Sequence, residues 1–583
     1  MSPPAVWAPD AHVVALVTSS GRAAMCRGDD GWWHAVEKLA PGARYGFAID
    51  DGPTLPDPRS ASQPDGVDGL SEVVDHDAFA WTDAPWRGIS KRGMVLYELH
   101  VGTFSGEGTF DGVIGHLDHL VDLGVDAIEL LPVAEFAGDR GWGYDGVALF
   151  APHHAYGGPD GLKRLVDACH RRGIGVVLDV VYNHLGPAGN HLPAFGPYFS
   201  ERHETNWGAA LNFDGPNSDE VRRLVIDNAC TWLHDYHLDG LRLDAVHAIV
   251  DDSARHVLEE LAATVDAIAT QTRRPLFLIA ESDLNDPRVV RSRDAGGYGI
   301  DAAWADEWHH ALHAFLTGER DGYYEDFGTL AHVAKALEQA WVYDGQWSPH
   351  RRRHHGRPPT GLSGHQLVVS AQNHDQIGNR ALGERSSALM SPGRLRIFAA
   401  LLLCAPFTPM LFQGEEWGAS TPFQYFTDHD AELGRAVSEG RRAEFSHFGW
   451  DPDQVPDPQA PATFEASRLD WDEPACSDHA DLLAWHRRLV ALRHQVADLG
   501  DPRLERTRVA VDEASTTLTV TRGLVALHVN LGASAATWEV TAGSTVLAAS
   551  AAAVSLDGQT LAVPPDAVAI VAPAARREST DDD

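Results

Sequence analysis

Apolar runs alternate with amphipathic stretches through the middle of the chain. The runs are 94–102, 125–133, 175–184, 238–246, 275–283, 299–306, 365–375 and 408–418. Between most of them the apolar residues recur at the spacing of one helix face, as in 110–124. Eight parallel strands joined mainly by helices close into a barrel. The pattern therefore predicts an α/β protein built on a (β/α)8 TIM barrel.

The two ends of the chain show a different pattern, with short alternating apolar and polar segments between frequent turns. Such segments are typical of antiparallel sheets. We therefore predict an N-terminal β-sandwich that resembles a carbohydrate-binding module over 1–88, the barrel with loop insertions over 89–500, and a C-terminal β domain over 501–583. The charged tail, 576–583, is predicted to be disordered.

Two connections of the predicted barrel are unusually long. The third begins with 185–208, which predicts an inserted loop domain over the mouth of the barrel. The sixth contains the basic run 351–359, which we interpret as an exposed loop. The longest apolar stretch, 398–412, is too short to span a membrane comfortably and contains Pro406 and Pro409. It predicts a buried helix followed by a buried strand.

Composition and charge exclude several classes of partner. The chain has 583 residues, of which 44% are hydrophobic and 22% charged, so it can bury a large core. Its net charge of −37 repels polyanions, which makes nucleic acid and anionic membranes poor partners. The five cysteines are scattered without a CxxC spacing, and the N-terminus has no basic segment before an apolar run. These features predict reduced thiols and a cytoplasmic location.

Polar side chains gather where the predicted strands end. In barrels of this kind, functional side chains project from the carboxyl ends of the strands. The strand ends supply His100, Asp179, Asn183, His184, Arg242, Asp244, Glu281, Asn373, His374, Asp375 and Glu415. Since side chains alternate between the two faces of a strand, Arg242 and Asp244 share one face. By the same rule Glu281 shares its face with the apolar Ile279.

Three of these carboxylates, Asp244, Glu281 and Asp375, come from separate strands and converge on one mouth. Such a group suits either a divalent-metal site or glycoside chemistry, in which one carboxylate attacks the anomeric carbon and another protonates the leaving oxygen. Arg242 favours the second use, because it holds Asp244 ionised and oriented, and a metal site does not need it. Glu281 follows an apolar run, which tends to raise a carboxyl pKa as a general acid requires. Taken singly, each acid is more often a helix cap or a surface charge.

Four segments carry a resemblance to a known family. Residues 176–184, 240–246, 277–282 and 371–376 read VVLDVVYNH, GLRLDAV, FLIAES and AQNHDQ. In order and spacing they resemble the four short sequence regions of the α-amylase superfamily of glycoside hydrolases. The resemblance implies a retaining double displacement. In it Asp244 is the nucleophile, Glu281 the acid/base, and Asp375 the third acid, which grips the sugar hydroxyls.

The same resemblance implies four binding residues. His184 and His374 bind the sugar at the cleaved bond, and Arg242 orients the nucleophile. Tyr144, in GWGYDG, lies under that sugar as an aromatic platform, and its structural alternative is ordinary loop packing. Neither a metal nor an organic cofactor is expected, because carboxylates handle the protons and the covalent bond.

Further segments resemble one family within that superfamily. Residues 41–69 look like the front sandwich shared by branching, debranching and trehalose-releasing enzymes, and 281–288, 373–385 and 421–445 resemble malto-oligosyltrehalose trehalohydrolases. The resemblance implies hydrolysis of the α-1,4-glucosidic bond next to the terminal trehalose unit of malto-oligosyltrehalose, an α-glucan oligosaccharide. It also implies a functional pairing with a malto-oligosyltrehalose synthase.

Two alternatives stay open at this point. A 1,4-α-glucan (glycogen) branching enzyme usually carries serine where this chain has Asn373, and a repeated glutamate where it has AES. A non-catalytic glycan-binding protein commonly lacks one of the three acids, and all three are present here. Residues that recognise the trehalose end are sought among the aromatic and acidic side chains of the loop 142–146, of the region around Trp308 and of 421–430.

Overall fold

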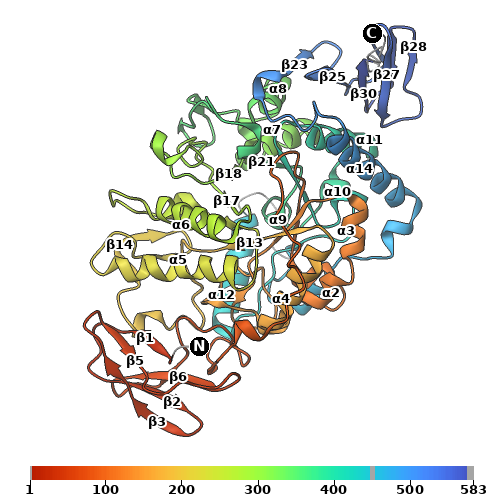
Figure 1. Cartoon of the computed structure of the whole chain (residues 1–583). Helices are drawn as coiled ribbons and strands as arrows, with labels where there is room; N and C mark the ends of the chain where they lie inside the picture. The colour runs from red at the N-terminus through yellow and green to blue at the C-terminus, as the bar shows by residue number, and fades with distance from the viewer. Residues whose placement is uncertain (1–2, 447–453, 574–583) are drawn as a thin grey trace, which may run out of the picture.

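The computed structural model describes residues 3–446 and 454–573. At its centre eight parallel strands close into a barrel, which confirms the predicted fold class (Figure 1). Around the barrel the strands are β9 (Leu96–Leu99), β10 (Ala127–Leu130), β13 (Gly175–Val180), β16 (Gly240–Leu243), β17 (Phe277–Ala280), β18 (Ala302–Trp304), β21 (Leu367–Ser370) and β22 (Thr408–Phe412). Pairing of β22 with β9 closes the ring. Each strand lies within one of the eight apolar runs of the sequence.

Helices cover the outside of the barrel and connect most of its strands (Figure 1). The α-helices of the described residues, on the outside and at the mouth of the barrel, are α1 (Val101–Phe104), α2 (Phe110–Ile114), α3 (Leu117–Leu123), α4 (Gly158–Arg171), α5 (Ser218–His234), α6 (Val257–Thr272), α7 (Asp306–Thr317), α8 (Leu330–Gln339), α9 (His374–Gly378), α10 (Ser386–Leu389), α11 (Pro392–Leu403), α12 (Ala431–Ser446), α13 (Pro461–Ala466) and α14 (Ser477–Gln495). Local chemistry sets their ends. Ser391 caps α11 by accepting from the N–H of Arg394, and Gly318 ends α7 in a left-handed conformation. The buried parts of α11 and β22 confirm the helix and strand predicted over 398–412.

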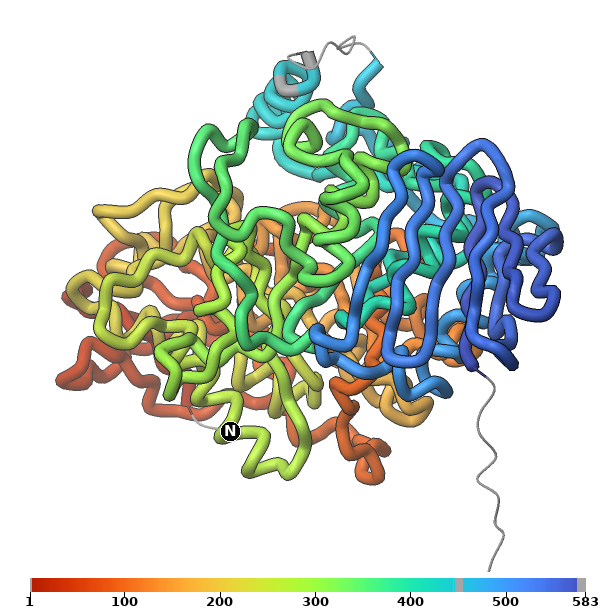
Figure 2. Tube along the Cα trace, turned by 90° about the horizontal axis from the view of Figure 1, so that it is seen from above, coloured from red at the N-terminus to blue at the C-terminus, as the bar shows by residue number. Residues whose placement is uncertain are grey.

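Antiparallel sheets flank the barrel. The N-terminal strands are β1 (Ala5–Trp7), β2 (Val14–Thr18), β3 (Gly21–Ala24), β4 (Cys26–Arg27), β5 (Trp32–His34), β6 (Arg44–Ile49), β7 (Thr54–Leu55) and β8 (Ser71–Glu72). The C-terminal strands are β23 (Thr507–Asp512), β24 (Thr517–Arg522), β25 (Val525–Asn530), β26 (Ala536–Glu539), β27 (Ser544–Ala549), β28 (Ser555–Asp557), β29 (Thr560–Val563) and β30 (Ala567–Pro573). Figures 1 and 2 show these two groups on opposite sides of the barrel. The boundaries at 88 and 500 stay predictions, and the tail 576–583 lies outside the described residues.

Short hairpins interrupt three connections of the barrel. They are β11 (Ala134–Glu135) with β12 (Ala148–Pro152), β14 (Phe199–Thr205) with β15 (Gly208–Leu211), and β19 (Trp347–Ser348) with β20 (Arg353–His354). The second hairpin belongs to the long third connection, as the sequence predicts. The third hairpin carries part of the basic run, of which Arg352, Arg353 and His354 are exposed.

The barrel interior explains why polar residues gather at one end. Buried apolar side chains fill its lower part: Leu96, Ala127, Val177, Phe277, Ile279, Ala302, Trp304, Val368 and Met410. Two positions further along β9, β10 and β13, the same face carries the buried acids Glu98, Glu129 and Asp179. The inward-facing positions are therefore apolar in the lower part of the barrel and charged near the carboxyl ends of the strands.

Two further predictions concern the membrane and the cysteines. Among the described residues, no helix combines the length and the hydrophobicity that crossing a membrane requires. All five cysteines are free thiols, and Cys26 and Cys476 are exposed.

Candidate active site

A cavity of about 750 Å³ opens at the carboxyl ends of the barrel strands. The predicted site residues that line it are Tyr144, His184, Asp244, Glu281 and Asp375. The other two, Arg242 and His374, are buried and contact carboxylates of that lining. The structure therefore brings all seven predicted residues together.

Arg242 joins three carboxylates at the floor of the cavity. Its Nη1 donates to Asp179 Oδ2 (2.7 Å) and to Asp244 Oδ1 (2.9 Å). Its Nη2 lies 3.0 Å from Glu281 Oε2. The guanidinium is fully buried and packs 4.2 Å from the centroid of the Trp304 ring. A buried cation that contacts several acids orients them and offsets their mutual repulsion. Arg242 therefore fixes the predicted nucleophile, Asp244, relative to the predicted acid/base, Glu281.

Asp244 follows β16, and both of its carboxylate oxygens are held. Oδ1 accepts from Arg242, and Oδ2 accepts from Asn183 Nδ2 at 2.7 Å. Burial raises the pKa of Asp244, while the Arg242 charge and the Asn183 hydrogen bond oppose that rise. The predicted contact with Arg242 is confirmed, but desolvation outweighs it in the pKa of this group. Arg242 and Asn183 together fix the orientation of the carboxylate.

Glu281 follows β17, the strand next to β16 in the barrel. The backbone N–H of Ala245 donates to Glu281 Oε2 at 2.7 Å. Ala245 has φ 40° and ψ 52°, a left-handed conformation that is unfavourable for a residue with a side chain. This strained conformation directs the backbone N–H of Ala245 towards the Glu281 carboxyl group. Burial raises the pKa of Glu281, as its apolar strand predicts, and the Arg242 charge opposes the rise.

His374 lies in a chain of hydrogen bonds. Glu98 on β9 accepts from its backbone N–H at 3.0 Å and from its ring Nδ1 at 2.6 Å. The ring Nε2 lies 2.8 Å from the Tyr144 hydroxyl, which donates to Asp179 at 2.6 Å. Burial alone lowers the pKa of His374, but the Asp375 and Glu98 carboxylates outweigh it and raise the pKa to about 9. The ring is therefore a cation at neutral pH.

Asp375 and His184 keep part of their side chains open to the cavity. Asp375 lies in the first turn of α9, and its side chain is 41% exposed. One of its oxygens accepts from Asn379 Nδ2 at 3.2 Å. His184 Nδ1 lies 2.5 Å from Asn183 Oδ1, and its ring stacks on Trp207 with 5.6 Å between centroids. Both residues can therefore offer polar atoms to a ligand.

The loop that carries Tyr144 is fixed by the segment that follows β22. Trp142 Nε1 donates to the Gln424 carbonyl at 2.9 Å, and Arg140 donates to Asp428 at 2.5 Å. These contacts hold the loop over the barrel mouth, so Tyr144 has a fixed position beside the site. Its hydroxyl is bonded within the site itself, which ordinary loop packing does not require.

Asp306 is a cavity carboxylate that the sequence analysis did not name, although it lies in the candidate region around Trp308. It begins α7 two residues after Trp304, whose side chain fills the barrel interior. The alternation that places Glu281 two residues after Ile279 would have found it. Burial, together with the charges of Glu281 and Asp375, raises the pKa of Asp306 to about 7. Asp306 therefore adds a fourth acid from a strand end to the cavity wall.

Trp308, His100 and Glu415, which the sequence analysis also singled out, do not line the cavity. Trp308 is fully buried and stacks on Phe398 with 5.8 Å between centroids, so Trp308 itself does not face the cavity, whereas Asp306 and His310 of the candidate region around it do. His100 is buried, with its Nε2 2.9 Å from the Gly141 carbonyl. Glu415 is also buried and lines a separate, small pocket.

The segment after β22 supplies the outer wall. The candidate stretch 421–430 contributes Tyr425, Thr427 and His429 to the lining, and α12 adds Leu433 and Val437. Sequence reasoning could select this stretch only through resemblance, because no strand end or periodicity marks it.

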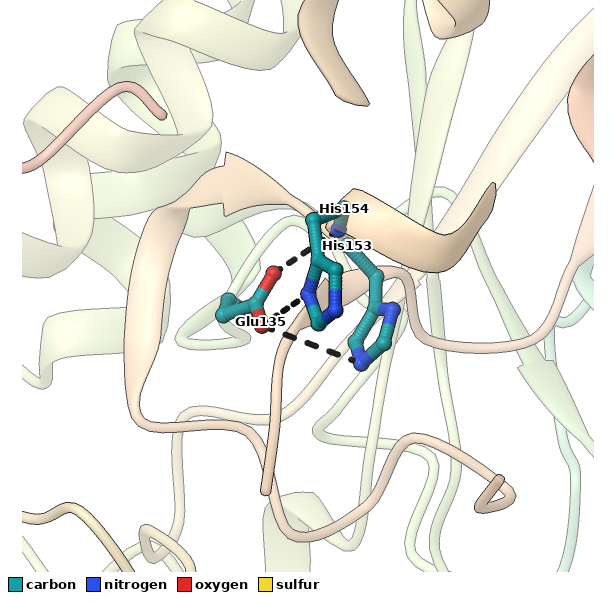
Figure 3. A group of neighbouring side chains, drawn as sticks. All are labelled: Glu135, His153 and His154. Carbon is teal, nitrogen blue, oxygen red and sulfur yellow. Dashed lines mark hydrogen bonds and ion pairs between the residues drawn. The ribbon is translucent and has the colours of Figure 1, made fainter. Parts of the chain in front are cut away.

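A second histidine–carboxylate group, formed by Glu135, His153 and His154, lies at the β11–β12 hairpin (Figure 3). Glu135 Oε1 lies 2.7 Å from His154 Nδ1 and 3.9 Å from His153 Nε2, and this donor set is one that zinc uses. However, His153 Nδ1 accepts from the Ala155 N–H at 3.2 Å, and its Nε2 lies 3.1 Å from the Gly138 carbonyl. Nε2 therefore carries the ring proton and cannot bind a metal. The group is a hydrogen-bonded brace for the loop after β11.

The cavity geometry fits nucleophilic and acid–base chemistry on a neutral, polar ligand. It contains a fixed carboxylate, a neighbouring carboxyl group with a raised pKa, and partly exposed polar groups around them. Two carboxyl groups in these roles are what glycoside hydrolysis requires.

Comparison with known proteins agrees with this geometry. Residues 63–193 match the family model of the α-amylase catalytic domain. The chain is 55% identical over 533 residues to the malto-oligosyltrehalose trehalohydrolase of Arthrobacter ramosus, with 90% of this chain and 92% of that protein covered. The chain belongs to the malto-oligosyltrehalose trehalohydrolase family.

A second trehalohydrolase and one solved structure are also similar to this chain. The trehalohydrolase of Mycobacterium tuberculosis is 51% identical over 535 residues, covering 91% of this chain and 92% of that protein. A Salmonella typhimurium structure, assigned provisionally as an α-amylase, is 38% identical with a TM-score of 0.89 and covers 97% of both chains. A glucan branching enzyme of Pseudoalteromonas atlantica is 27% identical, covering 74% of this chain and 62% of that protein. This trehalohydrolase-family member is therefore a glycoside hydrolase of the α-amylase family, and the branching alternative is only distantly related.

Proposed function

We propose that this protein hydrolyses the α-1,4-glucosidic bond next to the terminal trehalose unit of malto-oligosyltrehalose. It releases trehalose and a malto-oligosaccharide, with retention at the anomeric carbon. The observation that carries the proposal is that Asp244 and Glu281, from neighbouring strands, contact one buried guanidinium at the floor of an open cavity. Family membership supports the choice of substrate.

In the first step an Asp244 oxygen attacks the anomeric carbon of the sugar at the cleaved bond. Glu281 gives its proton to the glycosidic oxygen, the bond from carbon to that oxygen breaks, and trehalose leaves as a neutral alcohol. A malto-oligosyl ester of Asp244 remains, joined through the anomeric carbon. The raised pKa of Glu281 suits its role as the acid, and Arg242 keeps the two groups aligned.

In the second step water attacks the same carbon. The Glu281 carboxylate takes a proton from that water, the ester bond breaks, and Asp244 leaves as a free carboxylate. Two displacements at one carbon give retention, which requires carboxyl groups about 5–5.5 Å apart. That separation stays a prediction. Asp375 and His184 bind sugar hydroxyls through both steps, and Tyr144 lies under the ring. The predicted sugar contact of His374 is not available, because Glu98 and Tyr144 engage both of its ring nitrogens, so His374 instead positions Tyr144.

The test is product analysis with maltopentaose and maltosyltrehalose side by side. We expect rapid trehalose release from maltosyltrehalose and slow cleavage of maltopentaose, because only the first presents a trehalose leaving group. Equal rates on the two substrates would contradict the proposed specificity. The anomeric form of the fresh malto-oligosaccharide, followed by NMR, reports retention or inversion.

A second experiment separates hydrolysis from branching. Incubation with amylose is expected to leave no new α-1,6 bonds, since water and not a second glucan takes the glucosyl group. A lasting fall in iodine staining with new branches would identify a transferase instead.

We further propose a cytoplasmic location and a functional pairing with a malto-oligosyltrehalose synthase. The free cysteines suit a reducing compartment. The substrate has to be made by an enzyme that turns the reducing end of a malto-oligosaccharide into a trehalose unit. Detection of both activities in one soluble cell fraction would test both statements.

A further inference from the structure

We propose that Asp306, His310 and Gln376 form a polar wall that binds hydroxyl groups of the leaving trehalose unit. In this role the three residues select a non-reducing disaccharide as the leaving group. The inference rests on the proposed function, which it extends to specific residues. All three residues line the same cavity as Asp244 and Glu281.

The order of the strands places this wall on the leaving-group side. Around the barrel β16, β17, β18 and β21 follow one another, and the segments that leave their carboxyl ends carry Asp244, Glu281, Asp306 and Asp375, respectively. Asp244 attacks the anomeric carbon from one side, and Glu281 protonates the oxygen that leaves on the other. The leaving sugar therefore lies beyond Glu281 as seen from Asp244. Asp306 follows the strand next to Glu281 in that direction, and His310 is one helical turn further along α7.

The wall has hydrogen-bonding capacity that the protein itself leaves unused. Gln376 is 7% exposed, and its Oε1 has no hydrogen-bond partner; the buried Nδ1 of His310 has none either. In the described part of the chain Asp306 makes no ion pair, and Gln376 Nε2 donates to it over a long 3.5 Å. Unpartnered buried polar atoms destabilise a fold, so their presence in a cavity wall points to a ligand that completes them.

The protonation states suit a neutral ligand with many hydroxyl groups. Burial lowers the pKa of His310 to about 3, so its ring is neutral and offers one donor and one acceptor. Asp306, with its pKa raised to about 7, is partly protonated near neutral pH and can both donate and accept. Gln376 Oε1 adds an acceptor. The wall therefore contains no permanently charged cation, and its donors and acceptors suit a neutral ligand.

One exposed aromatic side chain lies next to the wall. Tyr323 lines the cavity, is 38% exposed, and packs on His310 with 4.5 Å between ring centroids. Sugar rings stack on such exposed aromatic faces while their hydroxyl groups reach polar neighbours. A polar wall beside an aromatic face thus has the composition of a sugar subsite.

The test compares two substrates that share the same donor sugar. Maltosyltrehalose needs the wall for its leaving group, whereas α-maltosyl fluoride does not, because fluoride is its leaving group. For Asp306→Asn we expect kcat/KM on maltosyltrehalose to fall about 10–100-fold, as loss of buried hydrogen bonds to a substrate does, and kcat/KM on the fluoride to change less than about threefold. Trehalose should also inhibit fluoride hydrolysis by the variant at least about tenfold more weakly.

His310→Gln is the second variant, because its unpartnered Nδ1 means that no internal hydrogen bond to that atom is lost. Asp283→Asn is the matched control: Asp283 lies close to Glu281 in sequence but pairs with Arg351 and does not line the cavity. We expect the control to keep the wild-type ratio between the two substrates. Equal losses on both substrates, or no loss on either, for Asp306→Asn and His310→Gln would overturn the inference. If the wild type itself does not prefer maltosyltrehalose over maltopentaose, the proposed function is wrong. This result differs from the results that would overturn the role of the polar wall, so the two hypotheses are tested separately.

Discussion

Two of the histidine–carboxylate groups in this protein have similar residues but differ in how many of their polar atoms are left for a ligand. At the barrel mouth, His374 is held by Glu98 and adjoins Asp375, whose side chain is 41% exposed towards the cavity. At the β11–β12 hairpin, Glu135 is fully buried and bonded to His154, and both ring nitrogens of His153 are engaged by the backbone (Figure 3). The first group leaves hydrogen-bonding capacity for a ligand, and the second uses all of it internally.

The comparison teaches that residue type alone does not identify a site. A chemically useful group needs polar atoms that face open space, and an internally satisfied group contributes to stability instead. Substitutions at the mouth are therefore expected to lower activity more than stability, and substitutions at the hairpin group the reverse. Four predictions test this contrast, from the largest expected effect to the smallest.

The largest effect is expected at the two catalytic carboxyl groups. Asp244→Asn and Glu281→Gln should each lower kcat on maltosyltrehalose by about 10³-fold or more, because each removes a group that acts in both steps. Steady-state kinetics measures the loss, and thermal unfolding verifies that the variants fold. Retention of full activity by either variant would refute its catalytic role.

Next comes the buried cation beneath the mouth. Arg242→Met leaves Asp179, Asp244 and Glu281 without their shared partner, and we expect a loss of about 3–5 kcal/mol in the free energy of unfolding as well as of activity. Arg44→Met is the matched control, because Arg44 pairs near the surface with Asp65 and Glu72, and its variant should lose only about 0–1 kcal/mol per pair. Urea unfolding measures the free energy of unfolding of both variants. Similar losses in the two would show that burial of the arginine does not determine its contribution to stability.

Glu98→Gln tests the charge on His374. Because the folded-state pKa of His374 is raised to about 9, its contribution to stability is fully present below pH about 6.5 and is lost as the pH rises through 9. Removal of the Glu98 charge lowers that pKa, so the loss should begin at a lower pH. We expect kcat/KM to fall about tenfold or more and the alkaline limb of its pH profile to move to lower pH. An unchanged alkaline limb would show that Glu98 does not act through His374.

The smallest effect on activity is expected at the hairpin group. Glu135→Gln should lower the free energy of unfolding by about 1–3 kcal/mol, since it disturbs a buried hydrogen-bonded pair. Its kcat/KM on maltosyltrehalose should stay within about threefold of the wild type. Zinc should not raise the melting temperature of the wild type, because the Nε2 proton of His153 blocks one of the three donors. Stabilisation by zinc that is lost in Glu135→Gln would show that this group is a metal site after all.

Much of this architecture follows from the sequence. Eight apolar runs place the barrel strands, since a strand buried on both faces has to be apolar along its length. Alternation then turns Arg242, Asp244 and Glu281 inwards, because side chains on a strand repeat every two residues. The same rule reaches Asp306, which the sequence analysis included only within the candidate region around Trp308. Trp308 itself belongs to the core, and sequence alone did not separate it from its cavity-lining neighbours Asp306 and His310.

Other features are decided by tertiary structure alone. The bonds of Glu98 to His374 and of Tyr144 to Asp179 join residues that are far apart in the chain, and no local pattern encodes such pairs. Whether a polar atom is satisfied or left open to a cavity depends on every element packed around it. The sequence by itself determined the barrel, its polar end and the three acids. Only the folded structure decided which histidines and carboxyl groups face the cavity. The sequence specifies the order of the strands, but closure of the barrel determines how far apart their side chains lie.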